Sequence, residues 1–178
     1  MTSKKAIVLG VICLLLLAVD VFSKAWTQAH IAPMAWSSIS YPYGGIGVFQ
    51  DWHGIDFSIN YVMNKGAAWG VFASLQQYLL YLRILIIAAM GAYLLLSKAS
   101  SFKKSALSFV LAGAVGNVID YFVYGHVVDM VHFQFWGYSY PVFNLADSLI
   151  FMGICFLFLQ AFFEKLKSIK KKNSQTIV

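Results

Sequence analysis

The sequence predicts an all-α membrane protein: a bundle of four transmembrane helices with a small β-rich extracytoplasmic platform between the first two. Composition is the first reason, because 60% of the 178 residues are hydrophobic and only 11% are charged, with a mean hydropathy of +0.72. Soluble domains average about 45–50% apolar and about 25% charged residues. The other two reasons are the number of long apolar stretches and the distribution of lysine between them.

Four apolar stretches each approach the roughly 20 residues that a helix needs to cross a bilayer. They cover about residues 6–29, 71–96, 105–123 and 143–163. No internal repeat or second domain is evident, so residues 1–178 are expected to form a single integral membrane domain. The first stretch also resembles a secretory signal peptide. Asp20 and Lys24 interrupt the region where processing would occur, and Pro33 follows Ala32, which favours an uncleaved first helix.

Lysine is distributed unequally between the segments that flank these stretches. Ten lysines lie before the first stretch, between the second and third, and after the fourth: Lys4, Lys5, Lys98, Lys103, Lys104, Lys165, Lys167, Lys170, Lys171 and Lys172. Lys65 is the one lysine in the other two connections. Because short cytoplasmic loops are enriched in Lys and Arg, both termini are predicted to be cytoplasmic. The net charge of +6 is explained in this way, so no nucleic-acid partner is expected.

The outward segment of about residues 30–70 is too long for a simple turn. It contains prolines, paired glycines and several aromatic residues, which are enriched at membrane interfaces. The alternating runs 46–49 and 57–62 are typical of short strands. We therefore expect a small β-rich platform on the outer membrane surface.

Two aspartates, Asp129 and Asp147, lie at the same predicted edge of the membrane. An ionisable residue in a membrane-embedded segment is a candidate functional residue because it is costly to keep there. Two carboxyl groups that converge can share a proton and perform acid–base chemistry on water. We predict that the two face each other across a small polar cleft. Asn144 lies three residues before Asp147 and shares its helix face.

Further polar residues accompany this pair. Asn64 and Gly66 belong to a loop motif that indicates either a turn or a functional segment. Asn117 and Asp120 are three residues apart, so they share a helix face. They are interpreted either as interhelical hydrogen-bonding groups or as support for the two carboxylates.

The first stretch contains an ionic pair, Asp20 and Lys24, whose four-residue spacing places both on one helix face. This pair either neutralises charge near the outer interface or forms a structural support beneath an active site. Small residues at positions 112, 113, 114 and 116 permit close helix contact, a common packing device in membranes.

Other chemistries have weaker signals. His126 and His132 flank the first of these aspartates, but their spacing matches no zinc signature. Ser148 lacks the G-x-S-x-G context of a nucleophilic serine. Cys13 and Cys155 lie within apolar runs, where a disulfide is not expected. The sequence therefore predicts neither a metal nor another cofactor.

Five short motifs follow one another along the chain. They are Asp20 with Ser23-Lys24, Asn64-Lys65-Gly66-Ala67-Ala68-Trp69-Gly70, Gly113-Ala114-Val115-Gly116-Asn117-Val118-Ile119-Asp120, Val128-Asp129, and Phe143-Asn144-Leu145-Ala146-Asp147. In this order they resemble the signal peptidase II family of lipoprotein signal peptidases. The resemblance covers nearly the whole chain, including the number and orientation of the spans.

The resemblance implies a bacterial aspartic endopeptidase of the cytoplasmic (inner) membrane. Such an enzyme removes signal peptides from diacylglyceryl-modified prolipoproteins, cutting just before the lipidated cysteine. It implies that Asp129 and Asp147 are catalytic. Its implied supporting residues are Asn64, Gly66, Asn117, Asp120, Asn144, Asp20 and Lys24. The expected partners are lipid-modified prolipoproteins and membrane lipid, with the chain itself a monomer.

Two positions depart from the family pattern. Tyr121 stands where the family commonly has an arginine, and Ala112-Gly113 replaces paired glycines. The first change removes a cation that could hold Asp120 or a substrate carbonyl. Lys65 is a candidate replacement for that cation.

Two rival functions remain open from the residues alone. A small ion-coupled transporter or channel subunit would place its carboxylates near the bilayer midplane and show internal repeats. A non-catalytic assembly protein would use its polar residues only to join helices.

Overall fold

Four long helices and a small sheet make up the part of the chain described by the computed structural model, which covers residues 2–34, 45–65 and 75–176. The elements are α1 (Ser3–His30), β1 (Ile46–Trp52), β2 (Ile55–Asn64), α2 (Gln76–Leu96), α3 (Ser101–Tyr124), β3 (Val127–Phe135), β4 (Tyr138–Ser139) and α4 (Leu145–Thr176). Each helix is long and apolar enough to cross a membrane, α4 over Leu145–Ile169. The four predicted apolar helices are confirmed, although residues 71–74 of the second lie outside the described residues.

Helix α3 lies at the centre of the bundle and packs against α1, α2 and α4. Glycine makes its closest contacts possible. A Cβ at Gly113 would overlap the backbone oxygen of Ala146 on α4, and a Cβ at Gly116 would lie 2.6 Å from Asp20 Oδ2 on α1. The predicted packing role is therefore confirmed for Gly113 and Gly116, which bring α4 and α1 against the C-terminal half of α3.

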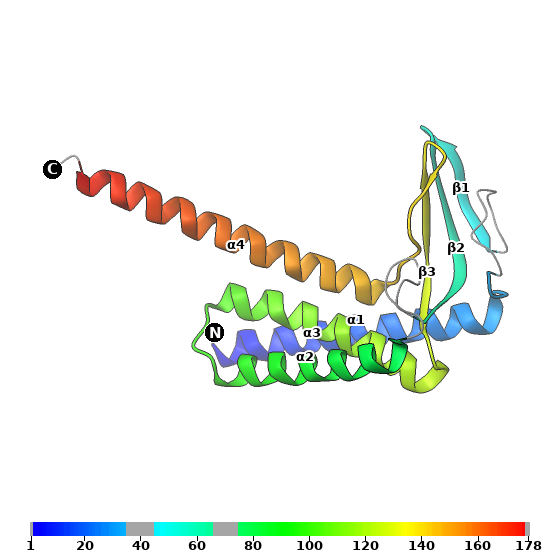
Figure 1. Cartoon of the computed structure of the whole chain (residues 1–178), viewed down its shortest axis with the longest axis horizontal. Helices are drawn as coiled ribbons and strands as arrows, with labels where there is room; N and C mark the ends of the chain where they lie inside the picture. The colour runs from blue at the N-terminus through cyan, green and yellow to red at the C-terminus, as the bar shows by residue number, and fades with distance from the viewer. Residues whose placement is uncertain (1, 35–44, 66–74, 177–178) are drawn as a thin grey trace.

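The sheet is antiparallel, with strand order β1-β2-β3-β4. It lies across one end of the helices, while the start of α1 and the end of α4 lie at the other (Figure 1). Strands β2 and β3 pair from Ile55 opposite Phe135 to Asn64 opposite Val127, and the register shifts between Ile59 and Val62. This pairing places Val62 opposite Asp129, so β2 ends beside the aspartate.

The expected fold class needs one correction. The runs predicted as strands, 46–49 and 57–62, lie within β1 and β2, but the sheet is not confined to the segment between the first two helices. Its other strands, β3 and β4, come from the connection between α3 and α4, which was expected to be a simple link. The protein is therefore a helical membrane bundle capped by a four-stranded antiparallel sheet rather than an all-α protein. Val127–Phe135 forms a strand because its β-branched and aromatic residues alternate with other residues and pair along β2.

The two faces of the sheet differ in chemistry. One face carries the stacked rings of Phe57 and Phe133, whose centroids are 4.6 Å apart, and Phe143 lies beside them. The opposite face carries His132, which is opposite Ser58 on β2 and is buried. Because side chains alternate along a strand, Asp129 shares the aromatic face with Phe133.

Substituting Gly113 tests the close packing of α3 on α4. Gly113→Ala should lower the free energy of unfolding by about 1–3 kcal/mol, because a rigid backbone oxygen occupies the space of the new methyl group. Gly10→Ala on α1 is the matched control, since a Cβ there meets nothing within 4 Å. Alanine also favours the helix over glycine, so this control should be neutral or slightly stabilising. Thermal unfolding in detergent measures both, and equal losses would contradict the packing argument.

Candidate active site

A buried ammonium group joins the C-terminal halves of α1 and α3. Lys24 Nζ lies 2.8 Å from Asp20 Oδ2 and 2.8 Å from Asp120 Oδ2, and these side chains are at most 1% exposed. The same nitrogen donates a hydrogen bond to Asn117 Oδ1 at 3.0 Å. The pairing of Asp20 with Lys24 was predicted from their spacing. Burial and the link to α3 favour a structural support over a pair that only neutralises charge at the interface.

The two carboxylates that pair with Lys24 also hold the backbone beside the predicted catalytic residues. Asp20 Oδ1 accepts a hydrogen bond from the backbone nitrogen of Ala146 at 2.8 Å, one residue before Asp147. Asp120 Oδ2 accepts from the backbone nitrogen of Val128 at 3.2 Å, one residue before Asp129. The Lys24 cluster, defined as Asp20, Lys24, Asn117 and Asp120, therefore fixes both chain segments.

Asp147 is held by the start of α4. Asn144 precedes the helix as its N-cap, and its Oδ1 accepts from the Asp147 backbone nitrogen at 2.8 Å. In return, Asp147 Oδ2 accepts from the Asn144 backbone nitrogen at 3.3 Å. This reciprocal pair is a capping box, with Asp in the place more often taken by Glu. Asn117 Nδ2 donates to the other oxygen, Asp147 Oδ1, at 2.8 Å.

Asp129 lies on β3 between two side-chain amides. Asn144 Nδ2 donates to its Oδ1 at 2.7 Å, and Asn64 Nδ2 from the end of β2 donates to its Oδ2 at 2.9 Å. The residue is 2% exposed. Burial, and then the charge of Asp147, raise the pKa of the Asp129 carboxyl to about 7. This carboxyl can therefore carry a proton near neutral pH.

The two aspartates come together through Asn144, which contacts both. Asn144 is buried, whereas Asp147 is only partly buried and Asn64 is likewise partly accessible. Asp147 is therefore the more accessible of the two aspartates, while Asp129 and Asn144 are enclosed.

Nearly all residues proposed from the sequence meet at this place. The structure brings together Asp20, Lys24, Asn64, Asn117, Asp120, Asp129, Asn144 and Asp147. Gly66 lies outside the described residues. Asp129 lies beyond the end of α3, on strand β3, whereas Asp147 lies in the first turn of α4.

Sequence reasoning missed two contacts that hold β2 and β3. The Tyr61 hydroxyl lies 2.8 Å from His126 Nε2, and both residues are buried. Thr27 Oγ1 on α1 donates to Met130 Sδ at 3.4 Å. His126 drew attention only as a possible metal ligand, and no sequence signal connected it with Tyr61. Met130 is next to Asp129, so the Thr27 contact helps to seat the strand that carries the aspartate.

The histidines form local polar contacts. His132 Nε2 lies 2.8 Å from Ser139 Oγ, and its Nδ1 accepts from Asn60 Nδ2 at 3.1 Å. Within the described ranges, no group of three His, Cys, Asp or Glu side chains is placed to hold a metal ion. Tyr121, at the position where the sequence departs from the family pattern, lies edge-on to the ring of Phe122.

Comparison with known proteins gives one consistent result. The family model described as signal peptidase (SPase) II matches residues 12–163. The lipoprotein signal peptidase of Chlamydia pneumoniae is 40% identical over 125 residues, which cover 69% of this chain and 74% of that protein. The lipoprotein signal peptidase of Chlamydia trachomatis serovar D is 32% identical over 154 residues, covering 85% of this chain and 89% of the other.

Solved structures agree at the level of the fold. A bacterial membrane enzyme determined at 2.3 Å resolution has a TM-score of 0.71 and 24% identity, and the match covers 89% of each chain. A second, at 1.9 Å resolution, has a TM-score of 0.68 and 25% identity over 86% of this chain and 92% of the other. The family model spans most of the sequence, including both aspartates and the Lys24 cluster. The chain therefore belongs to the signal peptidase II family.

Proposed function

We propose that this chain is an aspartic endopeptidase that removes signal peptides from diacylglyceryl-modified prolipoproteins, cutting just before the lipidated cysteine. Family membership supports the substrate class. The observation that carries the catalytic assignment is the hydrogen bonding of Asn144 to both Asp129 and Asp147. A carboxyl pair fixed in this way is suited to divide the tasks of acid and base.

The proposed chemistry requires one proton on the pair. One ionised carboxylate removes a proton from a water molecule, and the resulting hydroxide attacks the scissile carbonyl carbon. The protonated carboxyl donates a hydrogen bond to the carbonyl oxygen, where negative charge develops. When the tetrahedral intermediate breaks down, the peptide nitrogen leaves with a proton and the pair returns to its starting state. Burial of Asp129 beside a second carboxyl favours this singly protonated form.

The polar neighbours have distinct proposed roles. Asn64 and Asn144 orient the oxygens of Asp129, and Asn117 orients Asp147. The Lys24 cluster holds the peptide groups that precede both aspartates. None of these contacts requires a metal ion, so the reaction as proposed uses only carboxyl groups and water.

The proposed topology places both termini in the cytoplasm and the sheet on the outer face of the bacterial membrane. The uneven distribution of lysine supports it. Both aspartates then lie where a translocated precursor presents its modified cysteine. Labelling of a cysteine at Gln50, but not at Ala99, by an impermeant reagent on intact cells tests this orientation. The reverse pattern would contradict it.

A transporter or channel is the less favoured function. It required carboxylates near the bilayer midplane, whereas Asp147 is the third residue of α4 and Asp129 follows α3, at the same end of the bundle.

Asp129→Asn and Asp147→Asn should each abolish cleavage of a diacylated substrate and leave the protein folded. Each change is nearly isosteric but removes a titrating carboxyl, and a paired mechanism loses several orders of magnitude in rate when either member is removed. Release of signal peptide by purified protein in detergent measures the effect. Asp51→Asn, at an exposed position on β1, is the matched control and should retain full activity. Substantial turnover by either active-site variant would refute the assignment.

The pH dependence should reflect the raised pKa of Asp129. Cleavage should decline as the pH rises above about 7, because the second carboxyl then loses its proton. Stability should follow the same direction: the folded protein holds this proton more tightly than the unfolded chain, whose pKa is about 3.9. The contribution of the Asp129 proton to the free energy of unfolding is fully present below about pH 3.9 and is lost as the pH rises towards 7. Profiles of kcat/KM and of melting temperature against pH check both effects. If Asp129→Asn had the same pH profile of melting temperature as the wild-type protein, the predicted effect on stability would be contradicted.

The asparagines that touch the aspartates should affect activity more than stability. Asn64→Ala should lower kcat/KM by about tenfold to a hundredfold, because it removes a hydrogen bond to a charged or partly charged oxygen. Asn117→Ala and Asn144→Ala should act in the same direction, although Asn144→Ala also removes a helix cap and costs about 1 kcal/mol of stability.

Asn60→Ala is the matched control for these variants. Asn60 is buried on the same strand as Asn64, but it bonds to Ser58 and His132 on the other face of the sheet. This variant should lose stability and retain its turnover. If Asn64→Ala and Asn60→Ala lose activity and stability in the same proportion, the asparagines serve packing alone.

A further inference from the structure

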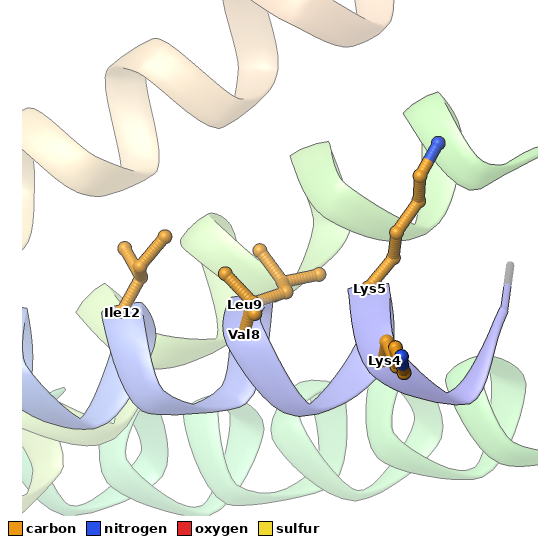
Figure 2. Close-up of a pocket in the computed structure, with 5 residues that line it drawn as sticks. All are labelled: Lys4, Lys5, Val8, Leu9 and Ile12. Atoms are coloured by element: carbon orange, nitrogen blue, oxygen red, sulfur yellow. The ribbon is translucent and has the colours of Figure 1, made fainter.

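Lys24 differs from the other two lysines of α1 because the protein fixes its partners. Lys4 and Lys5 are exposed in the first turns of the helix, and their side chains diverge (Figure 2). Lys24 is 0% exposed, and its nitrogen is surrounded by two carboxylates and Asn117 Oδ1. An ammonium group has three N–H donors and no acceptor. The side-chain atom of Asn117 that faces Lys24 must therefore be its oxygen.

The orientation of Asn117 fixes the direction of the hydrogen bonds around the two aspartates. With its oxygen turned to Lys24, Asn117 presents its amide nitrogen to Asp147 Oδ1, at 2.8 Å. The backbone fixes a second amide: the Asp147 N–H can only donate, so the atom of Asn144 that lies 2.8 Å from it is Oδ1. Asn144 Nδ2 then faces Asp129 Oδ1 at 2.7 Å. Neither amide can turn over without placing two donors against each other.

These fixed donors favour the ionised form of Asp147. Its Oδ1 accepts from Asn117, and its Oδ2 accepts from the backbone nitrogen of Asn144, 3.3 Å away. Hydrogen bonds donated to a carboxylate favour the charged form. Asp147 also lies in the first turn of α4, where the partial positive charge of a helix N-terminus stabilises an anion. It is only partly buried, so burial opposes its charge less than that of Asp129.

Asp129 has the opposite environment. It lies on a strand, which has no dipole comparable to that of a helix, and it is 2% exposed. Its Oδ1 accepts from Asn144, whose orientation is fixed. Its Oδ2 faces Asn64, whose amide can donate to a carboxylate or, turned over, accept from a protonated carboxyl. A proton is therefore accommodated at Asp129 Oδ2 with no conflict between donors.

Charged groups act on Asp129 from three helices. Asp147 on α4 raises the pKa of the Asp129 carboxyl, and Lys24 on α1 lowers it. Asp20 on α1 and Asp120 on α3 pair with Lys24, so much of its positive charge is neutralised within the cluster. Burial and the charge of Asp147 prevail, and the pKa of Asp129 is about 7.

We propose that Lys24 assigns the roles of the two aspartates. Through Asn117 it keeps Asp147 ionised as the general base, and the proton of the pair resides on Asp129. This inference rests on the proposed function for the reaction itself. Asp147 takes a proton from water while hydroxide adds to the carbonyl carbon, and the Asp129 hydroxyl donates a hydrogen bond to the carbonyl oxygen. When the C–N bond breaks, the proton on Asp147 passes to the leaving nitrogen, and Asp129 has kept its own.

Infrared spectroscopy of the purified full chain in detergent locates this proton without a substrate, because the C=O band of a protonated carboxyl is separate from the bands of a carboxylate. The wild-type protein should show this band below a pH of about 7 and lose it above. Asn64→Ala should shift the band, because Asn64 bonds to Asp129. Asn60→Ala changes the other face of the same strand and should leave the band in place. A band that Asn64→Ala leaves unmoved would overturn the assignment.

The two aspartate variants should differ in the same measurement. Asp147→Asn should keep the band, because burial still acts on Asp129. The band should titrate below pH 7 but above about 3.9, the pKa of an unperturbed aspartate. Asp129→Asn should have no such band in this range. Any other pattern in the two variants, each shown to be folded by its melting temperature, would contradict the proposed location of the proton.

The role of Lys24 is tested through Asn117, because removing Lys24 would leave two buried carboxylates uncompensated. In the Asp129→Asn background, Asn117→Ala should produce a protonated-carboxyl band from Asp147, since the donor that favours its ionised form is gone. Asn60→Ala in the same background should produce none. If Asn117→Ala also produces none, Lys24 does not assign the roles.

The outcome is independent of whether the proposed function holds. Cleavage of a diacylated substrate together with a contrary band pattern would refute the assignment of roles and leave the peptidase function in place. The expected band pattern without any cleavage would refute the peptidase function and leave the location of the proton in place.

Discussion

The buried charge of Lys24 is the constraint on which the rest of the structure depends. An ammonium group at 0% exposure is stable only when opposite charges and hydrogen-bond acceptors surround it, and Asp20, Asp120 and Asn117 supply them. Those partners come from α1 and α3, so the ion cluster determines how the two helices meet. Removing one partner of such a cluster typically costs about 3–5 kcal/mol, because a buried charge is left uncompensated.

The same cluster explains how carboxyl groups from a strand and a helix reach one place. Each acidic partner of Lys24 holds the peptide nitrogen just before one aspartate, Ala146 in one case and Val128 in the other. The N-cap of α4 then completes the arrangement, because Asn144 bonds to Asp147 through the backbone and to Asp129 through its side chain. Asn144 therefore caps α4 and at the same time fixes the positions of the two aspartates of the proposed dyad.

Much of this could be predicted from the sequence, for identifiable physical reasons. Long apolar runs define helices, and spacings of three or four residues place Asp20 with Lys24 and Asn144 with Asp147. Strand β3 could not be predicted in the same way, because its nine residues, six of them buried, lie in what reads as a link between two apolar helices. The contact of Asn64 with Asp129 depends on a register that shifts between Ile59 and Val62, and no local spacing encodes such a shift. The hydrogen bond from the Val128 backbone nitrogen to Asp120 could not be predicted either, because every residue type except proline has such a donor.

The positions of the charges also bear on how the protein is assembled in the membrane. Asp20 and Lys24 neutralise each other within α1, so this helix can enter a bilayer with its charge balanced. Asp120 has no such partner on α3, where the nearest lysine is 16 positions earlier, and a lone aspartate in a membrane helix is costly to insert. This cost is offset when α3 packs beside α1, because Lys24 then pairs with Asp120. Helix α1 precedes α3 in the chain and is therefore synthesised first. The Asp20–Lys24 pair of α1 thus provides the partner that α3 needs on insertion, in addition to its place in the folded protein.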